Sequence, residues 1–330
     1  MTRYNANLIG LSLLAALLFT GCAGVKPVDT EWEADRMDFR YLAATAEKAA
    51  NAYQCREELM EAYREGYETF VFYETFLGLE APCRYTGPIT YHRAYVLIPR
   101  CNGQAPCRKE RFIVIKGTET IGDWLVNMVV NPGDDETYHK GFRRAAIRLL
   151  DDINDWKAIE ADELVTLVGH SKGGAVAMSL FYHLVEEGHP PELLRLVTFG
   201  QPRVNQRTDD PHTGRMMRVV MEGDPVPFLP PYAEAIGLRY RHNSPAIHLL
   251  YSGMWRYKER EAPEPTPLAD YGLSLLGTNP DTHGIRYYVQ RLHGVVRKCG
   301  KEEPDESAPG GKAPGEGVVR MHFRDCMAAE

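Results

Sequence analysis

A glycine-flanked serine between a strand-like segment and a helix-like segment is the part of this sequence best suited to chemistry. Residues 164–168, Leu-Val-Thr-Leu-Val, form a short apolar run that predicts a strand buried on both faces. The pentapeptide Gly-His-Ser-Lys-Gly at 169–173 follows directly, and residues 174–178 begin a helical pattern rich in small side chains. This order is typical of a nucleophile elbow, a sharp turn that presents a serine hydroxyl beside the free N–H groups of a helix N-terminus.

The glycines of the pentapeptide have a steric purpose in such a turn. Gly169 and Gly173 stand two residues before and two residues after Ser171, where strand and helix pass so closely that a Cβ would clash. A Gly-x-Ser-x-Gly pattern also occurs in ordinary tight turns, so the five residues alone leave a structural serine open. The strand before them and the helix after them favour Ser171 as a nucleophile.

A nucleophilic serine needs partners from other parts of the chain. A histidine must accept its proton, an acid must orient that histidine, and two N–H donors must meet the oxyanion. The elements that could position such groups alternate along the chain, which predicts one α/β domain with a mainly parallel sheet. Helices are predicted over 31–54, 56–73, 141–156, 174–187 and 281–297, and strands over 90–98, 111–115, 164–168, 193–199, 216–221 and a last pair at 240–242 and 247–251.

Length and composition are those of a globular, enzyme-like chain. The 330 residues are 44% hydrophobic, which is enough for one sizeable core. A net charge of −7 without a basic cluster argues against a nucleic-acid partner. No spacing of cysteines and histidines indicates zinc, so we expect neither a metal nor a cofactor.

The N-terminus predicts export. Residues 1–21 have a charged start and an apolar run shorter than the roughly 20 residues that span a bilayer, as in a signal peptide. Residues 18–22, Leu-Phe-Thr-Gly-Cys, resemble a bacterial lipobox, which predicts acylation of Cys22 and attachment to a membrane. Ala23, rather than an aspartate, follows this cysteine and implies the outer membrane. The alternative is a plain signal peptide with an incidental cysteine.

The rest of the chain divides into three parts. We expect 22–40 to be a tether, 41–300 to be the α/β domain, and 301–330 to be a low-complexity tail tied by a cysteine. An even number of remaining cysteines in an exported protein predicts disulfides, although six cysteines allow 15 pairings. They are Cys55, Cys83, Cys101, Cys107, Cys299 and Cys326.

A series of motifs, in a shared order, resembles the class 3 lipase family, the fungal-type triacylglycerol lipases, over roughly residues 41–290. Each motif is modest, but their order is specific. They are Lys-Gly-Thr at 116–118, Asp-Trp at 123–124, His-Lys-Gly-Phe at 139–142, the elbow, Phe-Gly-Gln-Pro-Arg-Val at 199–204, Asp-Pro-Val-Pro at 224–227 and Pro-Pro at 230–231. The resemblance implies an α/β-hydrolase fold, with a mainly parallel central sheet and helices on both faces.

The resemblance also implies the roles of the nucleophile and the acid. It makes Ser171 the nucleophile and Asp224, which follows a strand-like run, the acid of a catalytic triad. The rival acids are Asp209 and Asp210, which lie in a polar loop with no strand before them. A turn-forming aspartate before proline is the structural alternative for Asp224. His170, inside the elbow, is interpreted as a structural residue rather than as the base.

Two backbone N–H groups would form the oxyanion hole by the same resemblance. They belong to Thr118 and to Lys172, the residue after the nucleophile. Lys116 and Lys172 depart from the family, which usually has Arg and Leu at these positions. Because a backbone donor survives any side chain, the oxyanion hole is not threatened. Lys172 would either favour anionic lipids or point to solvent without effect.

Two histidines compete for the role of base. His242 lies closer to Asp224 in the sequence, but His283 lies on a loop that opens the final predicted helix. Such a loop can bring one ring nitrogen to Ser171 and the other to the acid. In class 3 lipases the base also sits in a late Asp-x-His context followed by Tyr. We therefore expect His283 to be the base and His242 to be a structural neighbour.

Residues 120–130 occupy the position of the family's lid. A lid would expose an apolar helical face on a lipid surface, whereas a permanently packed helix would not move. The apolar side chains of this segment include Ile121, Trp124, Leu125 and Met128.

The sequence therefore predicts a serine carboxylic-ester hydrolase, a lipase acting on acylglycerols or related lipids through an acyl-enzyme. Its expected partners are a lipid or ester substrate and the membrane that its N-terminal anchor reaches. The alternative is a catalytically inactive surface lipoprotein that uses the fold as a binding module.

Overall fold

A computed structural model describes most of the predicted α/β domain. The described residues are 38–73, 92–100, 110–117, 139–207, 209–230, 239–258 and 280–299. The predicted signal peptide, Cys22, the oxyanion residue Thr118, the candidate lid at 120–130 and the tail at 301–330 lie outside these ranges.

One eight-stranded sheet runs through the domain, with its strands in chain order. The neighbouring strands from β3 to β7 pair in parallel, while β1, β2 and β8 pair antiparallel at the edges. The prediction of a mainly parallel sheet is confirmed. The strands are β1 (Tyr67–Tyr73), β2 (His92–Pro99), β3 (Glu110–Ile115), β4 (Leu164–His170), β5 (Leu194–Phe199), β6 (Met216–Met221), β7 (Ala246–Leu249) and β8 (Trp255–Lys258).

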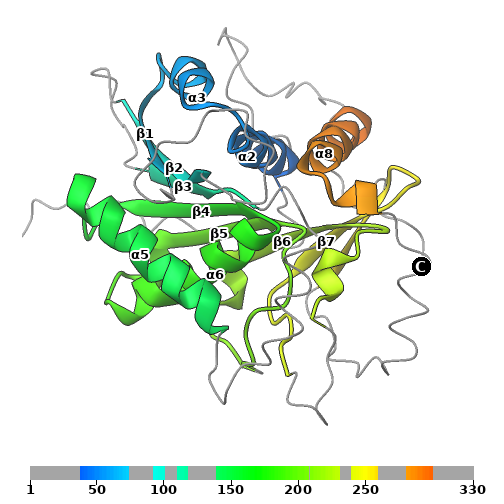
Figure 1. Cartoon of the computed structure of the whole chain (residues 1–330). Coiled ribbons are helices and arrows are strands. Elements are labelled where there is room, and N and C mark those ends of the chain that lie inside the picture. The colour runs from blue at the N-terminus through cyan, green and yellow to red at the C-terminus, as the bar shows by residue number, and fades with distance from the viewer. Residues whose placement is uncertain are drawn as a thin grey trace, which may run out of the picture.

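Helices cover both faces of the sheet. Figure 1 shows α2 and α8 side by side over one face, and α5 and α6 over the other. A separate apolar cluster lies under each pair of helices, so the sheet is buried on both sides. The α-helices are α2 (Phe39–Asn51), α3 (Arg56–Ala62), α5 (Lys140–Lys157), α6 (Lys172–Glu186) and α8 (Ile285–Cys299); the short 3₁₀ helices include η4 (Val226–Phe228) and η6 (Pro280–His283).

This arrangement is the α/β-hydrolase fold that the sequence predicted. Local signals account for its elements. Asp38 caps α2 by accepting a hydrogen bond from the N–H of Tyr41 at 2.9 Å. The buried residues of α5 follow a helical spacing, and all seven residues of β4 are buried. No helix among the described residues is long and apolar enough to cross a membrane.

Two predicted elements differ from the structure. The helix predicted over 56–73 ends at Ala62, and Tyr67–Tyr73 forms β1. This run is rich in aromatic and β-branched residues, and its pairing with β2 outweighs the helical pattern of the residues before it. The last strand pair was also assigned wrongly, because β7 pairs with Trp255–Lys258 and not with 240–242. Arg241 forms only an isolated bridge with Asn205.

Candidate active site

Ser171 occupies the turn between β4 and α6. Its backbone has φ 56° and ψ −130°, the only positive φ of a non-glycine residue in the described part of the chain. Such a conformation costs about 1–3 kcal/mol and persists only where the surroundings enforce it. Two close approaches enforce it here: a Cβ on Gly169 would collide with the Gly173 carbonyl, and a Cβ on Gly173 would collide with the Ile115 carbonyl.

The elbow presents the Ser171 hydroxyl beside a helix N-terminus. Lys172 is the first residue of the 15-residue helix α6, so its N–H belongs to the first turn, which lacks intrahelical acceptors. The Ser171 N–H is already bound to the Phe199 carbonyl at 2.9 Å, which ties the elbow to the end of β5. The Ser171 hydroxyl itself is buried and has no hydrogen-bond partner among the described residues. The predicted donor Thr118 lies outside the described residues.

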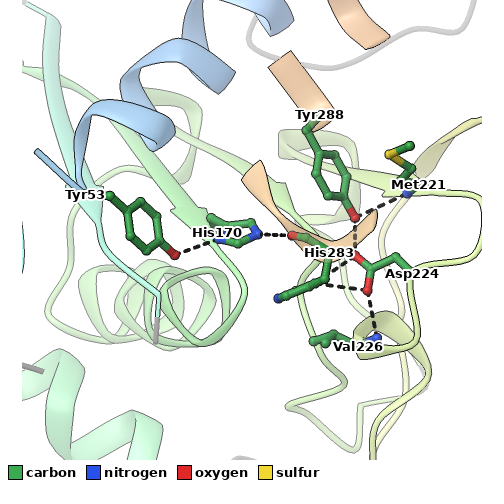
Figure 2. A network of polar contacts seen from close by, with 7 residues as sticks. All are labelled: Tyr53, His170, Met221, Asp224, Val226, His283 and Tyr288. Carbon is green, nitrogen blue, oxygen red and sulfur yellow. Dashed lines mark hydrogen bonds and ion pairs between the residues drawn. The ribbon is translucent and has the colours of Figure 1, made fainter. Parts of the chain in front are cut away.

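Asp224 and His283, which are 59 residues apart in the sequence, meet at the carboxyl end of the sheet. The Nδ1 atom of His283 lies 2.8 Å from Oδ2 and 3.0 Å from Oδ1 of Asp224 (Figure 2). Both side chains are almost completely buried, with exposed fractions of 1% and 0%. Asp224 lies three residues after the end of β6. His283 is the last residue of η6, and one residue separates it from the start of α8.

Two further donors fix the carboxylate of Asp224. The Val226 N–H donates to Oδ1 at 2.9 Å, and the Tyr288 hydroxyl donates to Oδ2. The hydroxyl of Tyr288 in turn accepts from the Met221 N–H at 3.3 Å. Burial, and then the charge of Asp224, raise the pKa of Tyr288 well above its usual value. Tyr288 therefore stays protonated at neutral pH and donates to the carboxylate.

The hydrogen bond between His283 and Asp224 determines which nitrogen of His283 can accept a proton. A neutral imidazole that donates its Nδ1 proton to a carboxylate leaves Nε2 as an acceptor, the form that a general base requires. Nε2 of His283 is buried and has no hydrogen-bond partner in the described part of the chain, like the hydroxyl of Ser171. The ring centroid of His283 lies 4.7 Å from that of His170, the residue before the serine. The structure therefore brings the imidazole of His283 into the same buried region as the Ser171 hydroxyl.

His170 does not bind the acid. One ring nitrogen, Nε2, lies 2.7 Å from the main-chain oxygen of His283, and the other, Nδ1, lies 2.7 Å from the hydroxyl of Tyr53. Burial, and then the nearby His283, hold the pKa of His170 well below its usual value. His170 is thus a neutral, fully hydrogen-bonded residue beside the nucleophile.

The rival candidates from the sequence lie in other surroundings. Asp209 is exposed, and Asp210 is bound to Tyr182 and Asn243. His242 donates from Nε2 to the carbonyl of Pro227 at 2.7 Å. The described structure therefore pairs Asp224 with His283, while Asp210 and His242 form hydrogen bonds with other groups.

Two tyrosines of the site were not singled out from the sequence. Tyr288 comes five residues after His283, and a tyrosine following the base was noted only as a feature of the resemblance. Tyr53 closes the turn after α2, more than a hundred residues from the group that it binds. A lone tyrosine after a helix carries no local signal, so this contact was not accessible to sequence reasoning.

The fold and the elbow place this chain among proteins with the α/β-hydrolase fold and a serine at the nucleophile position. Comparison with known proteins finds a more specific similarity. The family described as Lipase (class 3) matches residues 112–234. The secreted mono- and diacylglycerol lipase 1 of Fusarium solani is 29% identical over 155 residues. This alignment covers 43% of the present chain and 44% of that protein, so the chain spans less than half the length of this relative.

Solved lipase structures were also found. The lipase of Rhizopus microsporus var. chinensis has a TM-score of 0.49 and 21% identity over 74% of this chain and 85% of its own. The Rhizomucor miehei triacylglyceride lipase has a TM-score of 0.49 and 19% identity over 74% of this chain and 92% of its own.

Proposed function

We propose that this protein is a serine carboxylic-ester hydrolase, a lipase that acts on acylglycerols or related lipids. The observation that carries the proposal is the buried Asp224–His283 pair, whose free imidazole nitrogen lies in the same region as the strained Ser171. The match of residues 112–234 to the class 3 lipases supports an ester as the substrate. The name of the Fusarium relative supports a glyceride.

In the proposed reaction, the Ser171 hydroxyl attacks the ester carbonyl while Nε2 of His283 takes its proton. The Lys172 N–H, with Thr118 as the second donor, stabilises the negative charge that develops on the carbonyl oxygen. The tetrahedral intermediate then expels the alcohol, which receives the proton from His283, and leaves an acyl-enzyme. Water, deprotonated by the same nitrogen, releases the carboxylic acid and restores Ser171.

Asp224 has an electrostatic role in this cycle. When His283 carries the transferred proton, the imidazolium faces a carboxylate at 2.8 Å in a buried site, where the attraction is stronger than in water. The hydrogen bonds from Val226 and Tyr288 hold the carboxylate in place, so no reorganisation is needed when the charge forms.

The proposed enzyme is exported and attached to a membrane. We propose residues 41–300 as the catalytic domain, with an acylated Cys22 and the tether 22–40 attaching it to the bacterial outer membrane. The word "secreted" in the name of the Fusarium relative supports export. Cys55 is disulfide-bonded, which supports an oxidising compartment. Metabolic labelling with a palmitate analogue should tag the wild type, and equal labelling of Cys22→Ser would refute the anchor.

Substitution of the nucleophile tests the proposed activity. Ser171→Ala should lower kcat for ester hydrolysis by a factor on the order of 10⁶, because the acyl-enzyme can no longer form. The assay should use a series of glycerides and p-nitrophenyl esters of increasing chain length, which also defines the substrate. A fluorophosphonate probe should label the wild type and not the variant.

The same experiment decides against the alternative of an inactive binding module. A purified wild type that neither hydrolyses any of these esters nor reacts with the fluorophosphonate would favour that alternative. Labelling that persists in Ser171→Ala would show that the nucleophile is a different residue.

A further inference from the structure

The hydrogen bonds of His170 define a single protonation state. The main-chain oxygen of His283 can only accept, so the proton of this 2.7 Å contact lies on Nε2 of His170. Because burial keeps His170 neutral, Nδ1 then carries a lone pair and accepts the hydrogen of the Tyr53 hydroxyl, also at 2.7 Å. A chain of two hydrogen bonds therefore runs from Tyr53 through His170 to the backbone of His283 (Figure 2).

This chain holds His283 at a second point. Asp224 binds the ring of His283, while His170 binds the carbonyl of the same residue. The carbonyl lies where the 3₁₀ turn η6 ends and α8 has not yet begun. Binding at both the ring and the peptide group restrains the imidazole more than the carboxylate could alone.

Tyr53 is anchored close to the elbow itself. It follows α2, which packs against α8 and the sheet, and its N–H donates to the Ala50 carbonyl at 3.1 Å. A Cβ on Gly117 would lie 2.5 Å from the Tyr53 hydroxyl oxygen and 3.0 Å from the Ser171 Cβ. Gly117, the last described residue before Thr118, therefore lies between Tyr53 and the serine.

We propose that Tyr53 is a positioning residue for the base. Its hydroxyl holds His170 in the tautomer that binds the His283 carbonyl, and the two bonds together fix the imidazole relative to Ser171. The inference rests on the proposed serine-hydrolase function, and goes beyond it by giving the helix α2 a part in placing the base. The hydroxyl of Tyr53 does not need to touch the substrate for this role.

Tyr53→Phe is the sharpest test, because it removes one oxygen and keeps the ring. Displacement of the base slows the chemical step, so kcat should fall on the order of tenfold while KM changes less than about twofold. The rate of Ser171 labelling by a fluorophosphonate should fall by a similar factor.

Tyr63→Phe is the matched control. Tyr63 also lies beside α2, and its hydroxyl accepts a hydrogen bond from Asn51 at 2.9 Å, but it contacts none of the site residues described here. Its removal should leave kcat unchanged. An equal loss of kcat in Tyr53→Phe and Tyr63→Phe would overturn the proposal, as would an unchanged kcat or a change confined to KM in Tyr53→Phe.

Variants of His170 provide the rescue experiment. Glutamine offers an amide N–H near the position of Nε2, whereas leucine offers no donor, so His170→Gln should retain more of the wild-type kcat than His170→Leu. Equal losses would overturn the role of the donor; if His170→Leu does not fold, the Tyr53→Phe result decides. Ester hydrolysis that persists in Ser171→Ala would instead refute the proposed function, so the two failures are distinguishable.

Discussion

Two buried tyrosine–aspartate pairs in this protein share the same local construction. Tyr288 donates its hydroxyl to Oδ2 of Asp224, and Tyr182 donates its hydroxyl to Oδ2 of Asp210. In both cases Oδ1 of the aspartate accepts the main-chain N–H two residues later, at 2.9 Å and 2.8 Å. Both carboxylates are therefore held by a short turn and a buried phenol.

The two pairs differ in the third partner of the carboxylate. Asp224 receives the imidazole of His283, whereas Asp210 receives the amide of Asn243 at 3.0 Å. Asn243 in turn binds Asn205, so the second network joins two loops. An amide cannot take up and return a proton near neutral pH, while an imidazole can. The comparison teaches that the same construction holds two buried carboxylates, and that only the pair with His283 has a partner that can exchange a proton.

The largest effect should come from removing that histidine. His283→Ala should reduce kcat/KM to the level of Ser171→Ala, on the order of 10⁶ below wild type, because no base remains. His242→Ala should keep measurable activity, since His242 binds the Pro227 carbonyl. Both are measured on one soluble ester. An inactive His242→Ala together with an active His283→Ala would reverse the assignment.

The two aspartates should separate activity from stability. Asp224→Asn should lower kcat by about 10⁴, because an amide no longer enforces the Nδ1–H tautomer of His283. Asp210→Asn should leave kcat nearly unchanged and lower the free energy of unfolding by about 1–3 kcal/mol, since buried donors lose their charged acceptor. Steady-state kinetics and urea unfolding of both variants check this. Loss of activity in Asp210→Asn would remove the distinction between the two pairs.

The two tyrosines should show the same separation on a smaller scale. Tyr288→Phe should lower kcat about tenfold, because the carboxylate loses one of the donors that hold it against His283. Tyr182→Phe should cost about 1 kcal/mol of stability without a loss of kcat. If the kinetic constants of the two variants match, the tyrosine at Asp224 has only a structural role.

A last effect concerns the dependence of stability on pH, and it belongs to His170, the residue before Ser171. An unfolded histidine titrates near 6.5, but burial and the neighbouring His283 lower the pKa of His170 in the fold. Below about pH 6.5 the unfolded state therefore binds more protons, and stability falls as the pH falls, by at most about 1.4 kcal/mol per pH unit.

His170→Gln should remove this contribution. The free energy of unfolding of the variant should decline less steeply than that of the wild type between about pH 6.5 and pH 5. Other histidines with lowered pKa values, His139 and His189, remain in both proteins, so the difference in slope isolates His170. Parallel curves for the two proteins would show that His170 is not held neutral by the fold.

Much of the fold was predictable because its signals are local. The apolar run of β4, the helical spacing of α5 and the small residues that open α6 each lie within a few turns of chain. The prediction was wrong for Tyr67–Tyr73 and omitted Trp255–Lys258, both at edges of the sheet. At an edge, pairing with a distant neighbour decides the structure, and a short sequence window does not contain that neighbour.

The sequence by itself determined the elbow, because its strand, turn and helix are contiguous and its glycines are required by contacts within that unit and with the adjacent strand. Through the motifs that resemble class 3 lipases, it also predicted Asp224 as the acid and His283 as the base. Tertiary structure alone decided that Asp224 meets His283, that Asp210 meets Tyr182 and Asn243, and that Tyr53 reaches His170 across 117 residues of sequence. The physical reason is that a hydrogen bond depends on tenths of an ångström. Such distances follow from the register of the strands and the packing of the helices on the sheet.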